Sequence, residues 1–168
     1  MNLTALLEME WITAVAVWGY QNVPQATGEK EDQDLTPQFW SKALADYPEL
    51  ACHCSCWSEF AESAWTALLQ KQPRFAERCS CWKCFDLATW RVLLRYQPQL
   101  RDHCPEQNHP VVLSGLIGSG KFTTAELDTS KFSLEDWFWA VKYNPDAWLN
   151  CPCKEDFTSV MCRSYDII

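Results

Sequence analysis

Ten cysteines in 168 residues are the side chains of this sequence with the widest chemistry. Thiolates bind zinc and iron, and they act as nucleophiles when a base is close by. The two densest groups are Cys52, His53, Cys54 and Cys56, and then Cys79, Cys81 and Cys84. Zinc takes four ligands at about 2.0–2.3 Å, and the spacing Cys-x-Cys-x-x-Cys lacks the separated second pair of a common zinc site. We therefore predict no cofactor. Zinc or iron–sulfur binding through these groups is an alternative, with the metal ligands unknown.

The positions of most cysteines recur along the chain, which indicates a structural role. One register holds Cys54, Cys79, Cys104 and Cys151, and a second register two residues later holds Cys56, Cys81 and Cys153. A position that recurs in every repeat is typical of a small buried apolar side chain, and free cysteine is among the most buried residue types. The sequence therefore predicts a ladder of reduced cysteines in the core.

Catalysis by a cysteine would require a general base, and the three histidines of the chain are His53, His103 and His109. His53 and His103 stand just before ladder cysteines, so a position on the repeat surface explains them as well as catalysis does. We predict no catalytic residues and a protein that is not an enzyme.

A glycine-rich segment nearly matches a phosphate-binding P-loop. It reads Gly115-Leu-Ile-Gly-Ser-Gly-Lys121-Phe122-Thr123 and follows the apolar run 111–113, which resembles a strand. In a P-loop a hydroxyl follows the lysine and holds magnesium, but here that position is Phe122. The sequence also offers no second strand of a parallel sheet. We therefore predict a glycine-rich turn between helices and no nucleotide cofactor.

The elements that must position these side chains are tandem repeats. Each of four tryptophans stands eight residues before a proline and fourteen before a ladder cysteine. They are Trp40, Trp65, Trp90 and Trp137, with Pro48, Pro73, Pro98 and Pro145. The first three tryptophans are 25 residues apart. A unit of this length does not bury its apolar face alone, so it must stack on its neighbours.

Local rules predict two helical elements in each repeat. Five and four residues before each tryptophan stand an apolar residue and, in three copies of four, a good N-cap residue. These pairs are Leu35/Thr36, Phe60/Ala61, Phe85/Asp86 and Phe132/Ser133. The tryptophan then falls at N4 and packs on the apolar residue as a hydrophobic staple. The proline ends each first helix, about eleven residues long, near Tyr47, Gln72, Gln97 and Asn144. A short second helix or 3₁₀ turn follows, with Leu50, Phe75, Leu100 and Trp148 pointing inward.

These patterns predict an all-α fold: a single domain over residues 1–168 that forms a short α-solenoid of about 25-residue repeats. Its expected parts are an N-terminal capping helix (1–20), a loop (21–34), three repeats (35–104), an irregular insertion or degenerate repeat (105–131), and a fourth repeat with a C-terminal cap (132–168). In that cap, Phe157 and Thr158 begin another unit, but Cys162 replaces the tryptophan.

The repeat resembles short tandem repeats of uncharacterised bacterial proteins that are spelled around Trp-x-x-Leu-Leu-x-x-Gln-Pro-x-Phe-Ala. The clearest copy is Trp65-Thr-Ala-Leu-Leu-Gln-Lys-Gln-Pro-Arg-Phe-Ala76. The resemblance covers about two-thirds of the chain and implies no particular activity. The alternation of a helix with a shorter helix is also similar in shape to leucine-rich repeat variant solenoids.

Charge provides the main indication of function. The net charge is −8, yet residues 61–104 carry seven bases against four acids, while both flanks are acidic. Within this basic middle, Arg74 and Arg78 are four residues apart, as are Arg91 and Arg95. We expect each pair to line one exposed helix face and stacking to merge the pairs into one basic strip. A solvated face is the favoured interpretation of these charges, and the functional alternative is a surface suited to an acidic peptide or a phosphate backbone.

The sequence leads to two kinds of function besides metal binding. The first is a protein–protein interaction module, favoured by the small size of the solenoid and the absence of catalytic residues, with no direct DNA or RNA binding and an unknown oligomeric state. The second is an acidic inhibitor or nucleic-acid mimic that blocks a defence or nucleic-acid-binding protein. The segment 1–20 resembles neither a secretory signal nor a membrane span, so the sequence predicts a cytoplasmic protein without membrane contact.

Overall fold

The computed structural model describes residues 36–52 and 54–157, and all the regular structure in these ranges is helical. The chain divides into two compact units, Met1–Ser80 and Cys81–Ile168. The predicted capping helix (1–20) and loop (21–34) lie outside the described residues, as do Thr158 and Cys162. None of the described helices is long and apolar enough to cross a membrane.

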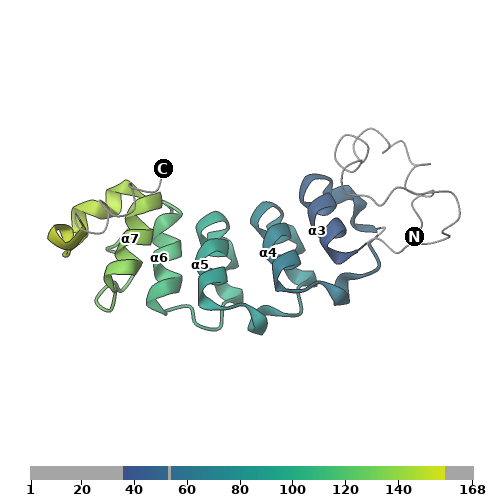
Figure 1. Ribbon diagram of the computed structural model, residues 1–168, viewed down its shortest axis with the longest axis horizontal. Coiled ribbons are helices and arrows are strands. Elements are labelled where there is room, and N and C mark those ends of the chain that lie inside the picture. The colour runs from purple at the N-terminus through teal and green to yellow at the C-terminus, as the bar shows by residue number, and fades with distance from the viewer. Residues whose placement is uncertain (1–35, 53, 158–168) are drawn as a thin grey trace, which may run out of the picture. The chain divides into compact units, whose positions relative to one another are not determined.

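The described residues of the first unit form two α-helices, each followed by a 3₁₀ helix. Its elements are α3 (Pro37–Asp46), η1 (Pro48–Cys52), η2 (Trp57–Glu59), α4 (Glu62–Lys71) and η3 (Pro73–Arg78). α3 and α4 pack side by side (Figure 1). The side-chain amide of Gln72, the C-cap of α4, donates a 2.9 Å hydrogen bond to the carbonyl oxygen of Ala45 in α3. Lys71 adds a 2.8 Å ion pair to Asp46, so both contacts join the C-terminal ends of the two helices.

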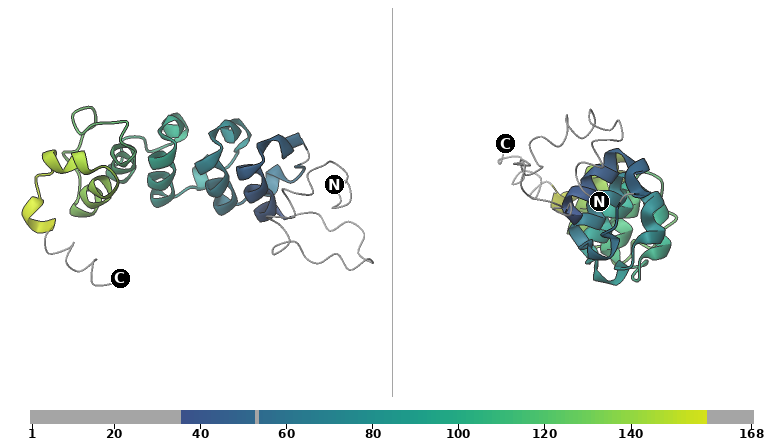
Figure 2. Two further views of the ribbon diagram at one scale, coloured as in Figure 1. Left: turned by 90° about the horizontal axis from the view of Figure 1, so that it is seen from above. Right: turned by 90° about the vertical axis from the view of Figure 1, so that its right-hand side faces the viewer.

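In the described part of the second unit, three α-helices are complete, and residues 154–157 are also α-helical. Its elements are η4 (Trp82–Cys84), α5 (Leu87–Tyr96), η5 (Pro98–His103), α6 (Pro110–Gly118), α7 (Leu134–Tyr143) and η6 (Pro145–Asn150). α6 packs between α5 and α7, as both views of this unit show (Figures 1 and 2). The amide of Asn144, the C-cap of α7, donates a 2.9 Å hydrogen bond to the carbonyl oxygen of Ile117 in α6. This bond spans 27 residues, as the bond from Gln72 to Ala45 does, so α6 relates to α7 as α3 relates to α4.

The predicted helix starts are confirmed. The side chains of Thr36, Asp86 and Ser133 each accept a hydrogen bond from a first-turn amide, and Ser133 forms a reciprocal capping box with Asp136. Ala61 occupies the same position before α4 in the same extended conformation, but it has no side-chain oxygen to contribute. The backbone before each tryptophan helix is therefore alike, whether or not the cap is bonded.

The predicted staples and helix ends are also confirmed. Ring centroids lie 5.1 Å apart for Phe60 and Trp65, 5.5 Å apart for Phe85 and Trp90, and 5.2 Å apart for Phe132 and Trp137. The fourth staple would involve residue 35, outside the described ranges. The four helices are ten residues long, and their C-caps are the four residues predicted to precede the prolines: Tyr47, Gln72, Gln97 and Asn144.

The core follows the predicted registers with two exceptions. The four tryptophans and the four cysteines of the first register are buried, whereas the cysteines of the second register are only partly buried. Leu50, Phe75 and Leu100 are buried after their prolines, whereas Trp148 is only partly buried and Ala147 lies inside instead. Ala147 stands two residues after its proline, as the three buried residues do, whereas Trp148 stands three residues after it. In a 3₁₀ helix, neighbouring residues point in directions that differ by about 120°, so only one of the two points into the core.

The prediction of a glycine-rich turn is wrong for the part of the segment up to Gly118, whereas residues 119–122 do form a turn and a bend between α6 and α7. Residues 110–118 form α6, so Val111–Leu113 are not a strand and the segment from Gly115 to Gly118 is not a turn between helices. His109 accepts a hydrogen bond as the N-cap, and Pro110 stands at N1, where its missing amide has no cost. Burial of seven of the nine residues between α5 and α7 outweighs the poor helix propensity of the two glycines.

Candidate partner-binding site

Small side chains on α6 shape the candidate site. Ser114, Gly115 and Gly118 are buried and lie on the face of α6 that supports the site. A Cβ atom at position 115 would overlap the carbonyl oxygen of Arg91 and come within 2.9 Å of its Cα. Glycine is therefore needed where the backbones of α5 and α6 approach each other. Because this face of α6 has almost no side chains, long side chains from α5 and α7 meet above it.

Arg91 of α5 is one of these side chains. Its guanidinium carbon lies 4.3 Å from the ring centroid of Trp139 on α7, within the range of a cation–π contact. Nη1 of Arg91 also lies 3.4 Å from Oε1 of Glu135, a long and exposed ion pair. The Arg91 side chain is only 12% exposed, so the expectation that it is an exposed charge is wrong. Its backbone approaches α6 at Gly115, while its guanidinium faces Trp139 and Glu135 of α7.

Arg95, one helical turn further along α5, makes the second contact of this kind. Its guanidinium carbon lies 3.8 Å from the ring centroid of Tyr143 and 4.2 Å from that of Tyr96. In the described part of the chain no carboxylate forms an ion pair with Arg95. The Nε atoms of both arginines are buried and have no hydrogen-bond partner. The predicted shared face of Arg91 and Arg95 is thus observed, and Arg95 retains an uncompensated charge.

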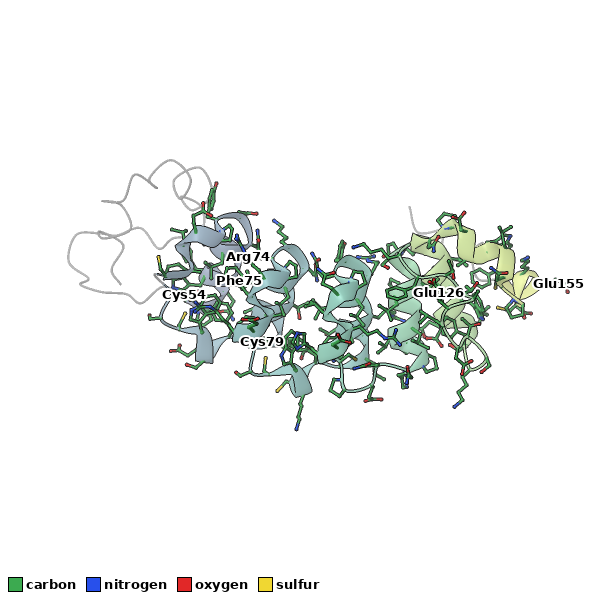
Figure 3. All side chains as sticks on the ribbon, turned by 180° about the vertical axis from the view of Figure 1, so that it is seen from behind. Cys54, Arg74, Phe75, Cys79, Glu126 and Glu155 are labelled. Atoms are coloured by element: carbon green, nitrogen blue, oxygen red, sulfur yellow. The ribbon has the colours of Figure 1, made fainter. Side chains whose placement is uncertain are left out.

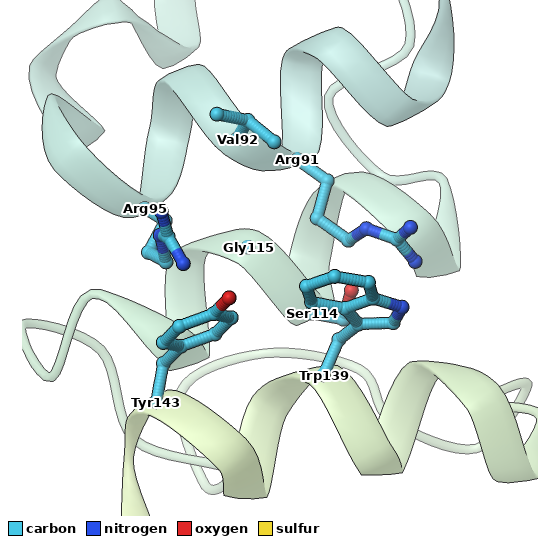
Figure 4. Close-up of a pocket in the computed structure, with 8 residues that line it drawn as sticks. Arg91, Val92, Arg95, Ser114, Gly115, Trp139 and Tyr143 are labelled. Atoms are coloured by element: carbon cyan, nitrogen blue, oxygen red, sulfur yellow. The ribbon is translucent and has the colours of Figure 1, made fainter. Parts of the chain in front are cut away.

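These side chains line a small, open pocket between α5 and α7 that has room for about one water molecule (Figure 4). Arg91 and Arg95 form one wall, Trp139 and Tyr143 form the other, and α6 forms the floor (Figure 4). Lys142 lies on the rim, with its Nζ atom 5.1 Å from the ring of Trp139 and 5.4 Å from that of Tyr143. The pocket therefore combines positive charge with aromatic surface. This combination binds anions that are attached to an organic group.

The pair Arg74 and Arg78 is arranged differently, which corrects the prediction for the first unit. Both belong to η3, and residues four apart in a 3₁₀ helix point in directions that differ by about 120°, because one turn has three residues. Arg74 lies over the ring of Phe75 at 5.5 Å, and Arg78 lies over Trp57 at 4.8 Å. η3 carries Arg74 and Phe75 in the first unit (Figure 3). The two arginines are exposed but do not share one helix face, so merger of all four into one strip stays a prediction.

An aromatic stack that sequence analysis missed recurs in both units. The ring of Trp57 stacks on that of Trp65 with 5.7 Å between centroids, and the guanidinium of Arg78 lies over the Trp57 ring. Twenty-five residues later, Trp82 stacks on Trp90 at 5.6 Å, and its ring is 4.4 Å from that of His103. The signal was present, because both partners of each stack recur with the repeat period. His103 is thus part of a repeated packing motif.

In two repeats, the cysteines of the two registers lie close together. The Sγ atoms of Cys54 and Cys56 lie 3.9 Å apart, and those of Cys151 and Cys153 lie 3.3 Å apart. Burial raises the pKa of Cys54 to about 12, and burial next to Cys151 raises the pKa of Cys153 to about 11. Among the described residues, which omit His53, no group of three or more His, Cys, Asp or Glu side chains is placed to hold a metal ion. Thiols of such high pKa remain protonated at neutral pH.

Comparison of the chain with protein-family models, with curated proteins and with solved structures finds no match. The argument for function therefore rests on the site itself.

Proposed function

We propose that this chain is a non-enzymatic protein–protein interaction module, built as a short α-solenoid of stacked repeats. Support comes from the equivalent packing of helix pairs within the units. The C-cap amides of α4 and α7 hold the ends of α3 and α6 in the same way, across the same number of residues. Repeats that stack through equivalent contacts build a continuous surface, and such surfaces bind proteins.

The observation that carries this proposal is the arginine and aromatic face of α5, α6 and α7. Arginine, tryptophan and tyrosine are the residue types enriched at the energetic centres of protein interfaces. Here Arg91 and Arg95 are held against Trp139 and Tyr143 before any partner arrives, so little side-chain entropy is lost on binding. The partner is an acidic protein surface, because opposite charge provides steering and specificity. A nucleic acid fits less well, because binding to a phosphate backbone relies on several Lys or Arg contacts, whereas the site offers one arginine without an internal ion pair.

Affinity capture with quantitative mass spectrometry tests this function. The full chain, an Arg95→Gln variant and a Lys83→Gln variant serve as baits in the source cell extract. Lys83 is exposed on η4 of the same unit and does not line the pocket. Its variant therefore removes the same charge at a position outside the site. We expect an acidic protein that the full chain and Lys83→Gln retain and that Arg95→Gln loses. Retention should fall as salt is raised, because salt screens exposed charges.

Two outcomes contradict the proposal. If no protein is retained above background, the interaction module is wrong. If the retained protein is a basic nucleic-acid-binding protein that Arg95→Gln retains and that high salt releases, the acidic regions provide the contact. The mimic interpretation then replaces the proposed site. Arg74→Gln and Arg78→Gln, measured in the same way, show whether the exposed arginines of the first unit take part.

A further inference from the structure

The proposed function leaves open which chemical group the pocket recognises. Arg95 is the informative residue, because two tyrosine rings cover its guanidinium, at 3.8 Å and 4.2 Å. Its Nε atom is buried without a partner. The terminal Nη groups are therefore the donors left for a ligand. These donors lie in the plane of the guanidinium and match the two oxygens of a planar carboxylate.

Arg91 shows how the second arginine of the pocket is already satisfied. Its Nη1 atom faces Oε1 of Glu135, while its ring contact is with Trp139. Glu135 comes from the first turn of α7, and its side chain is 71% exposed. In the described part of the chain no carboxylate pairs in this way with Arg95. The pocket thus contains one arginine with an internal carboxylate and one arginine without.

We propose that one carboxylate of an acidic peptide segment binds at the opening of this pocket, with the Nη edge of Arg95 as the anchor. The inference rests on the proposed function and names the chemistry of its partner. A single negative charge fits because Arg95 contributes one unpaired positive charge and Glu135 already neutralises Arg91. A dianionic phosphate would also meet repulsion from Glu135. Tyr96, 52% exposed, and Tyr143, 40% exposed, provide apolar surface beside the anchor for the flanking peptide.

A titration with defined peptides tests the proposal on the full chain. The probes are capped hexaglutamate, capped hexaglutamine and a hexapeptide with one phosphoserine and otherwise neutral residues. The readouts are the side-chain Nε–H resonances of arginine in ¹H–¹⁵N spectra and tryptophan fluorescence. We expect saturable binding of hexaglutamate with the largest shift at Arg95, weaker binding of the phosphopeptide, and no binding of hexaglutamine. Raising salt should weaken the binding.

Variants separate the anchor from general charge. Arg95→Gln should reduce hexaglutamate affinity by tenfold or more, equivalent to about 1.4 kcal/mol. Arg95→Lys, which keeps the charge but loses the planar guanidinium, should reduce the hexaglutamate affinity by a smaller factor. Lys83→Gln should bind as the parent does. Near-ultraviolet circular dichroism of each variant verifies that the aromatic packing is intact.

The outcomes distinguish this inference from the proposed function. The inference fails if binding of hexaglutamate is not saturable, if Arg95→Gln binds hexaglutamate with the affinity of the parent, or if the phosphopeptide binds more tightly than hexaglutamate. If a protein partner is captured equally by the full chain and by Arg95→Gln, the module function stands and the carboxylate anchor is wrong. If hexaglutamate binds at Arg95 but no protein is captured, the anchor stands and the module function is wrong.

Discussion

Two glycines of α6 allow a matched test of how the site is built. Gly115 and Gly118 are both buried, belong to one helix and face the same pocket. A Cβ atom at 115 would overlap the carbonyl oxygen of Arg91, which belongs to the backbone of α5 and has no rotamer through which to move away. A Cβ atom at 118 would lie 3.5 Å from Cβ of Tyr143 and 3.6 Å from the carbonyl oxygen of Trp139. These are ordinary contacts, so the same substitution has opposite consequences at the two positions.

The expected magnitudes follow from two opposing effects. Overpacking of a core costs about 1–3 kcal/mol, and a clash with rigid backbone falls at the upper end of that range. Replacing a helical glycine with alanine returns about 1 kcal/mol. Gly115→Ala should therefore lower the free energy of unfolding by about 2 kcal/mol. Gly118→Ala has no clash and stands at the helix end, so it should raise that free energy by about 0.5 kcal/mol.

Urea denaturation of the full chain, followed by circular dichroism and tryptophan fluorescence, measures both variants. With a denaturant slope of about 2 kcal/mol per molar, Gly115→Ala should shift the midpoint of the second unit's transition down by about 1 M. The close approach of α5 and α6 would be refuted if Gly115→Ala were as stable as the parent. It would also be refuted if the two variants changed stability equally.

Three further outcomes are expected. Trp65→Ala should lower the free energy of unfolding, measured by chemical denaturation, by about 3–5 kcal/mol, because Trp65 is 1% exposed and packs between Phe60 and Trp57. Trp139→Ala removes a partly exposed ring and should lower it much less. Equal losses for the two variants would contradict the repeat register. Ala61→Ser should raise the free energy of unfolding by about 0.5–1 kcal/mol, because it adds an N-cap oxygen where the backbone already has the cap conformation. An unchanged urea midpoint would show that the cap geometry of α4 differs from that of the other helices. In timed alkylation with iodoacetamide at pH 8, analysed by mass spectrometry, the exposed Cys52 and Cys84 should react before Cys54. The Cys54 thiol, with a pKa of about 12, should remain unreactive until urea unfolds the chain; early labelling of Cys54 would contradict its burial.

Sequence patterns alone predicted the local structure of the tryptophan repeats. A cap residue, a tryptophan at N4 and a proline after the apolar stripe act within about fifteen residues of one another, and each has a steric or hydrogen-bonding effect that needs no distant partner. The starts at Thr36, Asp86 and Ser133 and the ends at Gln97 and Asn144 therefore agree with prediction. The burial of the cysteines of the first register was predictable for the same reason, since a repeated position has a repeated environment.

The site depended on contacts that no local pattern describes. Glycines and β-branched residues favour a turn or a strand, and only packing between α5 and α7 makes residues 110–118 a helix. Arg91 and Trp139 are 48 positions apart, and they meet because Gly115 and Gly118 leave the face of α6 open beneath them. A spacing of four residues correctly predicted a shared helix face for Arg91 and Arg95, which lie on an α-helix. The same prediction failed for Arg74 and Arg78, because they lie on a 3₁₀ helix. The sequence determined each repeat through short-range sterics and capping. The tertiary structure decided which charges meet aromatic rings, because that depends on how closely the helix backbones approach.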